Sequence, residues 1–184
     1  MPAFANTFPL AATLSRKKPR LPLKEALAKI ESFLAKAKDV SLGYRELAFV
    51  SHQELDGGQI GYRIDADGNS LMSGSDGDWQ ENWWVIATDE LGDPIFVDLN
   101  SDNLPVFTAA HGEGSWEELL IANSLSGFTE ILSTLYKTSI GRTDPVKFEK
   151  KPLMEVEKRE LLEIIQMHTP DNQAEYWNIF LTCD

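Results

Sequence analysis

The sequence has a single cysteine, Cys183, among its 184 residues. One thiol cannot form a disulfide within the chain or build a cysteine-rich zinc site, and it favours a reducing compartment. No run of about 18 apolar residues occurs, so we expect no transmembrane helix and no membrane partner. Apolar residues make up 42% and charged residues 25% of the chain, which is typical of a globular protein and excludes fibrous or wholly disordered chains.

Motifs of common enzyme chemistry are missing as well. The sequence contains no nucleophile elbow, no phosphate-binding glycine loop with its lysine, no HExxH pair and no EF-hand loop. Gly57-Gly58 and the pair Gly74 and Gly77 lack the lysine and the helix that a phosphate loop needs, so they are interpreted as turns. No motif for a cofactor is therefore found, and we expect none.

Basic residues are scarce in the middle of the chain. Residues 41–136 contain 17 acidic residues but only 2 basic ones, Arg45 and Arg63, a balance of −15, whereas the whole chain carries −12. Such a segment repels phosphates and lacks the cations that nucleic-acid binding requires. An acidic face can steer a basic protein toward itself, although acids that only solvate loops would give the same count. The charge thus argues against a nucleic-acid partner for this segment and leaves both a basic protein partner and plain solvation open.

The chain is predicted to consist of a disordered tail, residues 1–21, and a single domain, residues 22–184. In the tail, apolar residues precede the basic cluster, which is the reverse of the order in a secretory signal peptide. We therefore expect a cytoplasmic protein. The oligomeric state stays open.

Apolar periodicity predicts the secondary structure. Residues at helical spacing predict helices over 22–39, 115–136, 153–168 and 173–181. Short apolar runs between turn residues predict strands over 44–50, 59–64, 84–88, 94–99 and 105–109. Ser115, with Glu118 three residues later, fits a capping box for the second helix, and residues 137–152 are interpreted as a connection. This order predicts an α+β domain with a largely antiparallel sheet.

Two groups of polar residues are candidates for chemistry. His111 and Glu113 follow a predicted strand, where a histidine can act as a base or a metal ligand. Four acids flank the strand over 94–99 and its preceding turn: Asp89, Glu90, Asp93 and Asp98. A metal-dependent enzyme that uses Asp93, Asp98 and His111 is therefore an alternative. The competing interpretation is that these side chains bind the backbone of their own turns and loops.

Three tryptophans gather in one glycine- and aspartate-rich stretch. Trp79, Trp83 and Trp84 lie in a loop and in the predicted strand that follows it. Such a cluster can grip a partner, because aromatic side chains contribute large contact areas. It can equally form part of the core.

Residues 82–128 carry an ordered series of short motifs. It begins with Val85-Ile86-Ala87-x-Asp89 and continues with G-D-P-x-F-x-D at residues 92–98 and P-V-F-T at residues 105–108. His-Gly at 111–112, Trp-Glu at 116–117, I-A-x-S at 121–124 and Phe128 follow. In order and spacing this run of about 50 residues resembles the SMI1/KNR4 family, or SUKH superfamily.

The resemblance implies a fold and a role. The implied fold is α+β, with a curved, largely antiparallel sheet of about five or six strands flanked by helices. The implied role is non-enzymatic binding, because many bacterial members look like immunity proteins that neutralise polymorphic toxins, often nucleases. In the G-D-P-x-F-x-D motif, Gly92 permits a turn and Phe96 is expected to face the core. Asp98 then faces the same side and must be paired or lie at the end of the sheet.

The sequence thus predicts an intracellular immunity protein that neutralises a basic toxin, such as a nuclease, by forming a direct complex with it. The alternatives are a scaffold or oligomer subunit without a toxin link and the metal-dependent enzyme. The residues proposed to bind the partner are Asp76, Asp78, Trp79, Glu81, Trp83, Asp89, Glu90, Asp93, Asp98, His111 and Glu113.

Overall fold

The computed structural model describes residues 21–170 and 174–182. Within them, six strands form one sheet: β1 (Val40–Leu42), β2 (Arg45–Phe49), β3 (Trp83–Asp89), β4 (Pro94–Asp98), β5 (Val106–Thr108) and β6 (Leu119–Ala122). The helices are α1 (Leu23–Leu34), α2 (Leu125–Ser139), α3 (Pro145–Lys150), α4 (Glu155–His168), α5 (Glu175–Thr182) and the short 3-10 helix η1 (Gly57–Gln59). The predicted tail lies outside the described residues except for Leu21, and so does Cys183.

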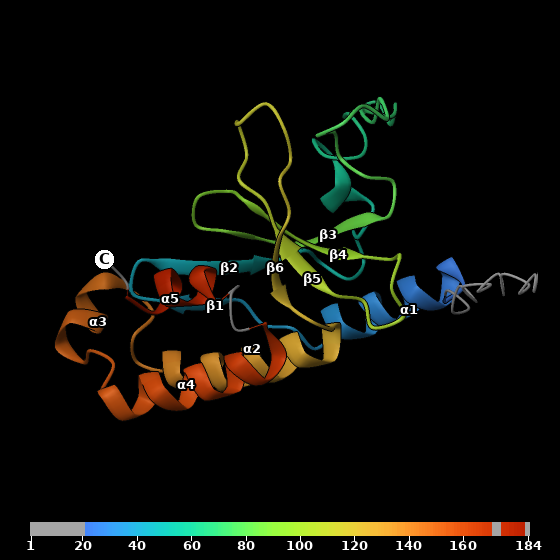
Figure 1. Ribbon diagram of the computed structural model, residues 1–184. Coiled ribbons are helices and arrows are strands. Elements are labelled where there is room, and N and C mark those ends of the chain that lie inside the picture. Colours follow the sequence, from blue (N-terminus) through green and yellow to red (C-terminus); the bar gives the residue numbers. More distant parts are fainter. Residues whose placement is uncertain (1–20, 171–173, 183–184) are drawn as a thin grey trace, which may run out of the picture.

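The strands of the sheet follow one another in chain order. Neighbouring strands pair in the order β1-β2-β3-β4-β5-β6, and every pair is antiparallel. The register shifts between Val85 and Ala87 in β3 and between Val106 and Phe107 in β5, and such bulges increase the local twist. The sheet is curled, as Figure 1 shows. The predicted α+β fold with its antiparallel sheet of five or six strands is confirmed.

One face of the sheet packs against the helices. Ile86, Ile95 and Val97 in the central strands are fully buried against Phe128 of α2 and Trp177 of α5. Figure 1 shows α1, α2 and α4 lying along this side. We call this cluster the helix-side core. Burial of apolar area at roughly 25 cal/mol per Å² makes it the main source of stability.

The other face is covered by loops. Trp79, Trp83, Val85, Phe96 and Ala109 form a second buried cluster, the loop-side core. The chain between β2 and β3 and the loop between β5 and β6 extend from this side of the sheet (Figure 1). Phe96 therefore does face a core, as the motif predicts, but it faces the core beneath the loops and not the one beneath the helices.

The strand predicted over 59–64 is wrong. The segment contains the end of η1, then turns and two isolated bridges. Its link to the sheet is the buried side chain of Gln59, which donates to the carbonyls of Leu55 (2.9 Å) and Val85 (3.0 Å) and accepts from the Val85 amide (3.0 Å). A side-chain amide thus replaces a strand at this point, and apolar alternation does not reveal such pairing.

The helix predicted over 115–136 is also wrong in its first part. Residues 119–122 form β6, which pairs with β5, and α2 begins only at Leu125. Ser115 and Glu118 are therefore not a capping box. The cap is Ser124, whose hydroxyl accepts the Gly127 amide at 3.0 Å. An apolar run such as Leu119 to Ala122 suits a strand and a helix equally, so periodicity alone could not separate them.

Three smaller differences concern the ends and connections. The first helix ends at Leu34 instead of continuing to residue 39, and Asp39 accepts the Phe49 amide at 2.8 Å next to the sheet. Strand β1 follows directly and was not predicted. The predicted connection over 137–152 contains α3, with Pro145 in its first turn and Asp144 as its cap. The helix predicted over 153–168 corresponds to α4, and the C-terminal helix to α5.

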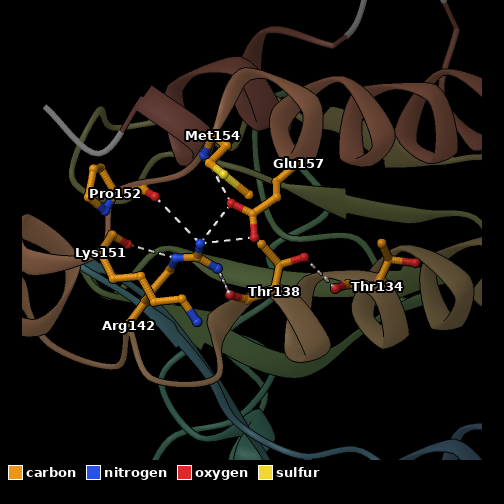
Figure 2. Close-up of polar contacts among 7 residues, drawn as sticks. All are labelled: Thr134, Thr138, Arg142, Lys151, Pro152, Met154 and Glu157. Carbon is orange, nitrogen blue, oxygen red and sulfur yellow. Dashed lines mark hydrogen bonds and ion pairs between the residues drawn. The ribbon is translucent and has the colours of Figure 1, made fainter.

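A buried arginine joins the helices at the C-terminal side. Figure 2 shows the Arg142 guanidinium between the Glu157 carboxylate and backbone carbonyls. It donates to both carboxylate oxygens (2.9 and 2.7 Å) and to the carbonyls of Thr138 (2.7 Å), Lys151 (2.7 Å) and Pro152 (3.4 Å). The end of α2, the loop after α3 and the start of α4 thus share one cation.

Candidate partner-binding site

A pocket of about 570 Å³ opens at one end of the sheet. The start of β2, the end of β3, the end of β5 and the start of β6 meet there, because antiparallel strands alternate in direction. Helix α5 forms one wall, and the indole N–H of its Trp177 donates to the Ile121 carbonyl at 2.8 Å, which fixes the helix beside β6. The volume lies in the usual range for ligand pockets, about 300–1,000 Å³.

Five carboxylates surround the pocket. Asp89, Glu90 and Asp93 come from the turn between β3 and β4, while Glu113 and Glu117 come from the loop between β5 and β6. Arg45 is the basic lining residue, and its guanidinium is 2.5 Å from a Glu90 carboxylate oxygen. The remaining acids give the opening a strongly negative field, which attracts cations.

Apolar side chains form much of the lining. Leu91, Ala109, Leu119, Ile179 and Phe180 belong to it. Leu91 is 65% exposed and Ile179 50% exposed, so two large apolar side chains of the lining meet solvent. Apolar walls with a few polar groups are characteristic of binding sites, whereas a purely solvated acidic surface has no such walls.

The turn between β3 and β4 holds its acids in fixed positions. The Asp89 carboxylate accepts the amides of Leu91 and Asp93, both at 2.9 Å, and the Gly92 amide binds the Asp89 carbonyl. Gly92 has φ = +86°, a conformation that side chains disfavour, which explains the glycine of the motif. The Asp89 side chain is thus both part of the turn and part of the rim.

The proximity of the acids changes their chemistry. Partial burial raises the pKa of Asp89, and the neighbouring charges of Asp93 and Glu90 raise it further, against the lowering effect of its two backbone hydrogen bonds. The ionised form of Asp89 is therefore held in an unfavourable environment. A cation placed in the pocket would stabilise that form.

His111 is tied to the same turn. Its ring Nδ1 lies 2.6 Å from an Asp93 carboxylate oxygen, and its backbone amide donates to that oxygen at 2.8 Å. The sequence grouped both residues in the metal-dependent alternative, and the structure places these two in contact. Together they fasten the loop between β5 and β6, which carries Glu113 and Glu117, to the turn between β3 and β4.

Tyr176 of α5 contributes a buried hydroxyl to the pocket lining. Its oxygen is shielded from solvent and has no hydrogen-bond partner among the described residues. Burial raises the pKa of this hydroxyl well above its usual range, and the charges of Asp89 and Glu90 add to the effect. Buried polar atoms without a partner are rare in folded proteins, so this hydroxyl calls for an explanation.

Of the predicted site residues, five meet at the pocket. Four of them line the pocket: Asp89, Glu90, Asp93 and Glu113. The fifth, His111, reaches it through its contact with Asp93. Trp79 and Trp83 are 2% and 6% exposed and belong to the loop-side core, so the core interpretation of the tryptophan cluster holds for both.

The other predicted site residues lie outside the pocket. Asp76 is exposed, and Asp78 accepts backbone amides of its own loop, among them those of Ser73 and Trp79. This loop contacts the edge of the pocket region, where the Trp116 amide donates to the Gly77 carbonyl at 2.8 Å. Glu81 lies beside a different hollow, which Arg63 also lines.

Asp98 does not join Asp93 and His111. It ends β4, whereas Asp93 precedes that strand, and at about 3.3 Å per residue the two lie roughly 16 Å apart along the chain. Asp98 binds the Asn82 side-chain amide and the Asn100 backbone amide, so it is paired at the end of the sheet, as alternation required. The three residues of the metal-dependent alternative, Asp93, Asp98 and His111, are therefore not brought together in the described structure. Among the described residues no group of three or more histidine, cysteine and acidic side chains is arranged to hold a metal ion.

Several pocket residues were not singled out from the sequence. Arg45, Glu117, Tyr176, Ile179 and Phe180 reach the pocket from segments far apart in the chain. One signal was available for Arg45, because either of the two arginines within a segment of 17 acids is expected to form an ion pair. Nothing local indicates that Tyr176, some 85 residues after the acids, would lie beside them.

Comparisons with protein-family models, with curated proteins and with solved structures yielded no match for this chain. The resemblance to the SMI1/KNR4 family therefore stays a prediction that rests on the motif residues. None of the helices in residues 21–170 and 174–182 combines the length and apolarity needed to cross a membrane.

Proposed function

We propose that this chain is a non-enzymatic binding protein of the immunity type, which neutralises a basic toxin domain by forming a direct complex with it inside the cell. The observation that carries the proposal is the pocket at the end of the sheet, in which five carboxylates surround apolar walls. Apolar walls provide affinity, and the carboxylates steer a basic partner and fix its orientation. The motif resemblance points to the same role.

The physical logic suits a nuclease as the target. A nuclease carries a basic surface that binds phosphates, and an acidic protein that covers this surface excludes the nucleic acid. Electrostatic steering makes such association fast at low salt, with rate constants up to about 10⁸–10⁹ M⁻¹s⁻¹. The negative field at the pocket opening, together with the balance of −15 over residues 41–136, provides the required attraction.

The test begins with capture of the tagged protein from its own cells at low salt, followed by identification of a stoichiometric basic partner. With that partner purified, Glu113→Lys/Glu117→Lys is expected to slow association at least tenfold. The matched control is Glu160→Lys/Glu163→Lys on exposed positions of α4, which changes the net charge equally but does not touch the pocket. Equal association rates of the two variants, or binding that does not respond to salt, would contradict the proposal.

A further inference from the structure

The pocket combines two properties that few ligands satisfy together. Its rim is anionic, through Asp89, Asp93 and Glu117, and its walls are apolar, through Leu119 and Ile179. A small inorganic cation would satisfy the rim but not the walls. The long basic side chains satisfy both, because their aliphatic stems pack on apolar surface while their charged ends reach carboxylates.

The Tyr176 hydroxyl adds an independent indication. The ring that carries it lies beside aromatic rings of its own helix, with centroid-to-centroid distances of 5.1 Å to Trp177 and 6.2 Å to Phe180, and the hydroxyl has no hydrogen-bond partner in the described structure. Leaving such an atom unpaired costs free energy in the unbound protein. Because this oxygen is shielded from solvent in the unbound protein, the Tyr176 side chain must shift for a ligand N–H in the pocket to supply the missing partner.

We propose that the pocket receives an arginine side chain of the protein partner. This inference rests on the proposed function and specifies the contact at its centre. The stem of the arginine lies against Leu119 and Ile179, and its guanidinium lies between the Asp89 carboxylate and the Tyr176 hydroxyl oxygen, which accepts one of its N–H groups. The acids at the opening contribute long-range attraction.

Arginine suits this geometry better than lysine. A guanidinium has five N–H donors in a planar fork, so it can satisfy acceptors on two sides at once. It is also more weakly hydrated than an ammonium group, so it loses less solvation when it enters a pocket with apolar walls. Lysine would offer one compact charge and retain more of its water.

The direct test uses three small probes with long side chains and different head groups: N-acetylarginine amide, N-acetyllysine amide and N-acetylcitrulline amide. The citrulline probe copies the shape of arginine without its charge. In an NMR titration of the whole protein, the arginine probe is expected to shift the amides of Leu91, Ala110 and Ile179 in a saturable manner. The lysine probe should bind at least threefold more weakly, and the citrulline probe should give no saturable shift.

Two variants separate the two parts of the contact. Tyr176→Phe removes the hydroxyl and should weaken the arginine probe at least threefold without lowering the stability of the protein, since the hydroxyl has no partner to lose. Asp89→Asn keeps the shape of the side chain, removes its charge and should weaken the probe at least tenfold. The controls are Tyr136→Phe on α2 and Asp67→Asn, which change exposed residues away from the pocket and should leave binding unchanged.

The outcomes distinguish this inference from the proposed function. Equal binding of the arginine and citrulline probes, or no saturable shift with the arginine probe, would overturn the arginine pocket. Salt-dependent binding of a captured toxin that is insensitive to Tyr176→Phe and Asp89→Asn would also overturn it, while the proposed function would stand. If the arginine probe binds as expected but no basic protein is neutralised, the pocket stands and the immunity role fails.

Discussion

Arg142 is a buried cation whose hydrogen bonds lead to three carbonyls and one carboxylate. Its side chain is 3% exposed and that of Glu157 is 23% exposed. The Met154 backbone amide lowers the pKa of Glu157, and the hydrogen bond and charge of Arg142 lower it further, against the opposing effect of desolvation. The pair therefore contributes stability above the ordinary glutamate pKa, and this contribution is lost as the pH falls through the lowered value.

Replacing Arg142 by methionine is expected to destabilise the protein by about 3 kcal/mol, because the carbonyls and the carboxylate lose their donor while they stay largely shielded from water. Urea unfolding monitored by circular dichroism measures the change. Lys147→Met is the control, since the Lys147–Asp144 ion pair is exposed and should matter little. A similar loss of unfolding free energy in both variants would show that the buried network stabilises the protein no more than an exposed ion pair does.

The environment of Asp89 leads to a prediction about pH. Its raised pKa means that the folded protein binds the proton more tightly than the unfolded chain does. The charge of Asp89 therefore lowers the stability as the pH rises through that raised value. Asp89→Asn, whose amide oxygen can still accept the turn hydrogen bonds, should be more stable than the natural protein at pH 7 and should lose this advantage near pH 3. Urea unfolding at a series of pH values tests this, and a constant difference would contradict it.

At the residue scale, the sequence predicted correctly those features that depend on residues close to one another in the chain. The requirement that Asp98 be paired or lie at a sheet end followed from alternation, and the structure satisfies it. Asp89, Glu90 and Asp93 were recognised because they are close in the chain. Tyr176 was not recognised, because it lies beside these acids only through the packing of α5. The residues next to Tyr176 in the chain do not indicate that packing.

At the scale of elements, α2 and α4 approach closely at a glycine. A Cβ atom on Gly127 would lie 2.7 Å from Nδ1 and 3.0 Å from Cβ of His168. His168 cannot easily give way, because its ring binds Glu130 at 3.0 Å and its carbonyl accepts the Asn123 amide at 2.7 Å. The glycine weakens the helix itself but permits the contact between the helices.

Gly127→Ala is therefore expected to destabilise the protein by about 1–3 kcal/mol, even though alanine is the better helix former. Thermal unfolding measures the change, and Ser133→Ala at an exposed position of α2 should leave stability nearly unchanged. Adding His168→Ala to Gly127→Ala should recover part of the loss by making room. If the two changes were simply additive, the close contact would not be its cause.

The elements that the sequence predicted well have strong periodic signals and clear ends. Strands β3 and β4 lie within a residue of their expected limits, and α4 ends at the expected His168. The failures occurred where long-range pairing decides between two local possibilities. Leu119 to Ala122 became a strand because β5 offers it a partner, and Gln59 joined β3 through its side chain and left its backbone in turns.

At the scale of the whole molecule, the sheet separates two cores of different construction. The helix-side core contains residues of α1, α2, α4 and α5, whereas the loop-side core is closed by loops. Loops have fewer cooperative backbone hydrogen bonds than helices, so the loop-side core is expected to open at lower free energy. Gln59 makes two hydrogen bonds to Val85 and so links those loops to β3.

Gln59→Leu should therefore weaken one side of the molecule more than the other. Loss of the amide leaves two carbonyls and the Val85 N–H unpaired, at a cost of about 2 kcal/mol. In native-state hydrogen exchange, amides of the loop-side core should exchange about 30-fold faster, while those of α2 should change little. Gln53→Leu, at an exposed position, is the control. Equal acceleration on both sides would mean that the two cores unfold together.

Because the strands of the sheet pair in chain order, the number of residues between two neighbouring strands determines how much entropy their pairing costs. Four residues join β3 to β4, whereas residues 50–82 separate β2 from β3. Because loop closure costs more entropy for longer loops, the two hairpins with short turns, β1–β2 and β3–β4, are expected to form first, and β3–β4 has the longer strands. The β3–β4 hairpin carries Asp89, Glu90 and Asp93 at its turn, so we expect their mutual repulsion to act already in the folding transition state. Salt, which screens this repulsion, should therefore accelerate folding more than it slows unfolding.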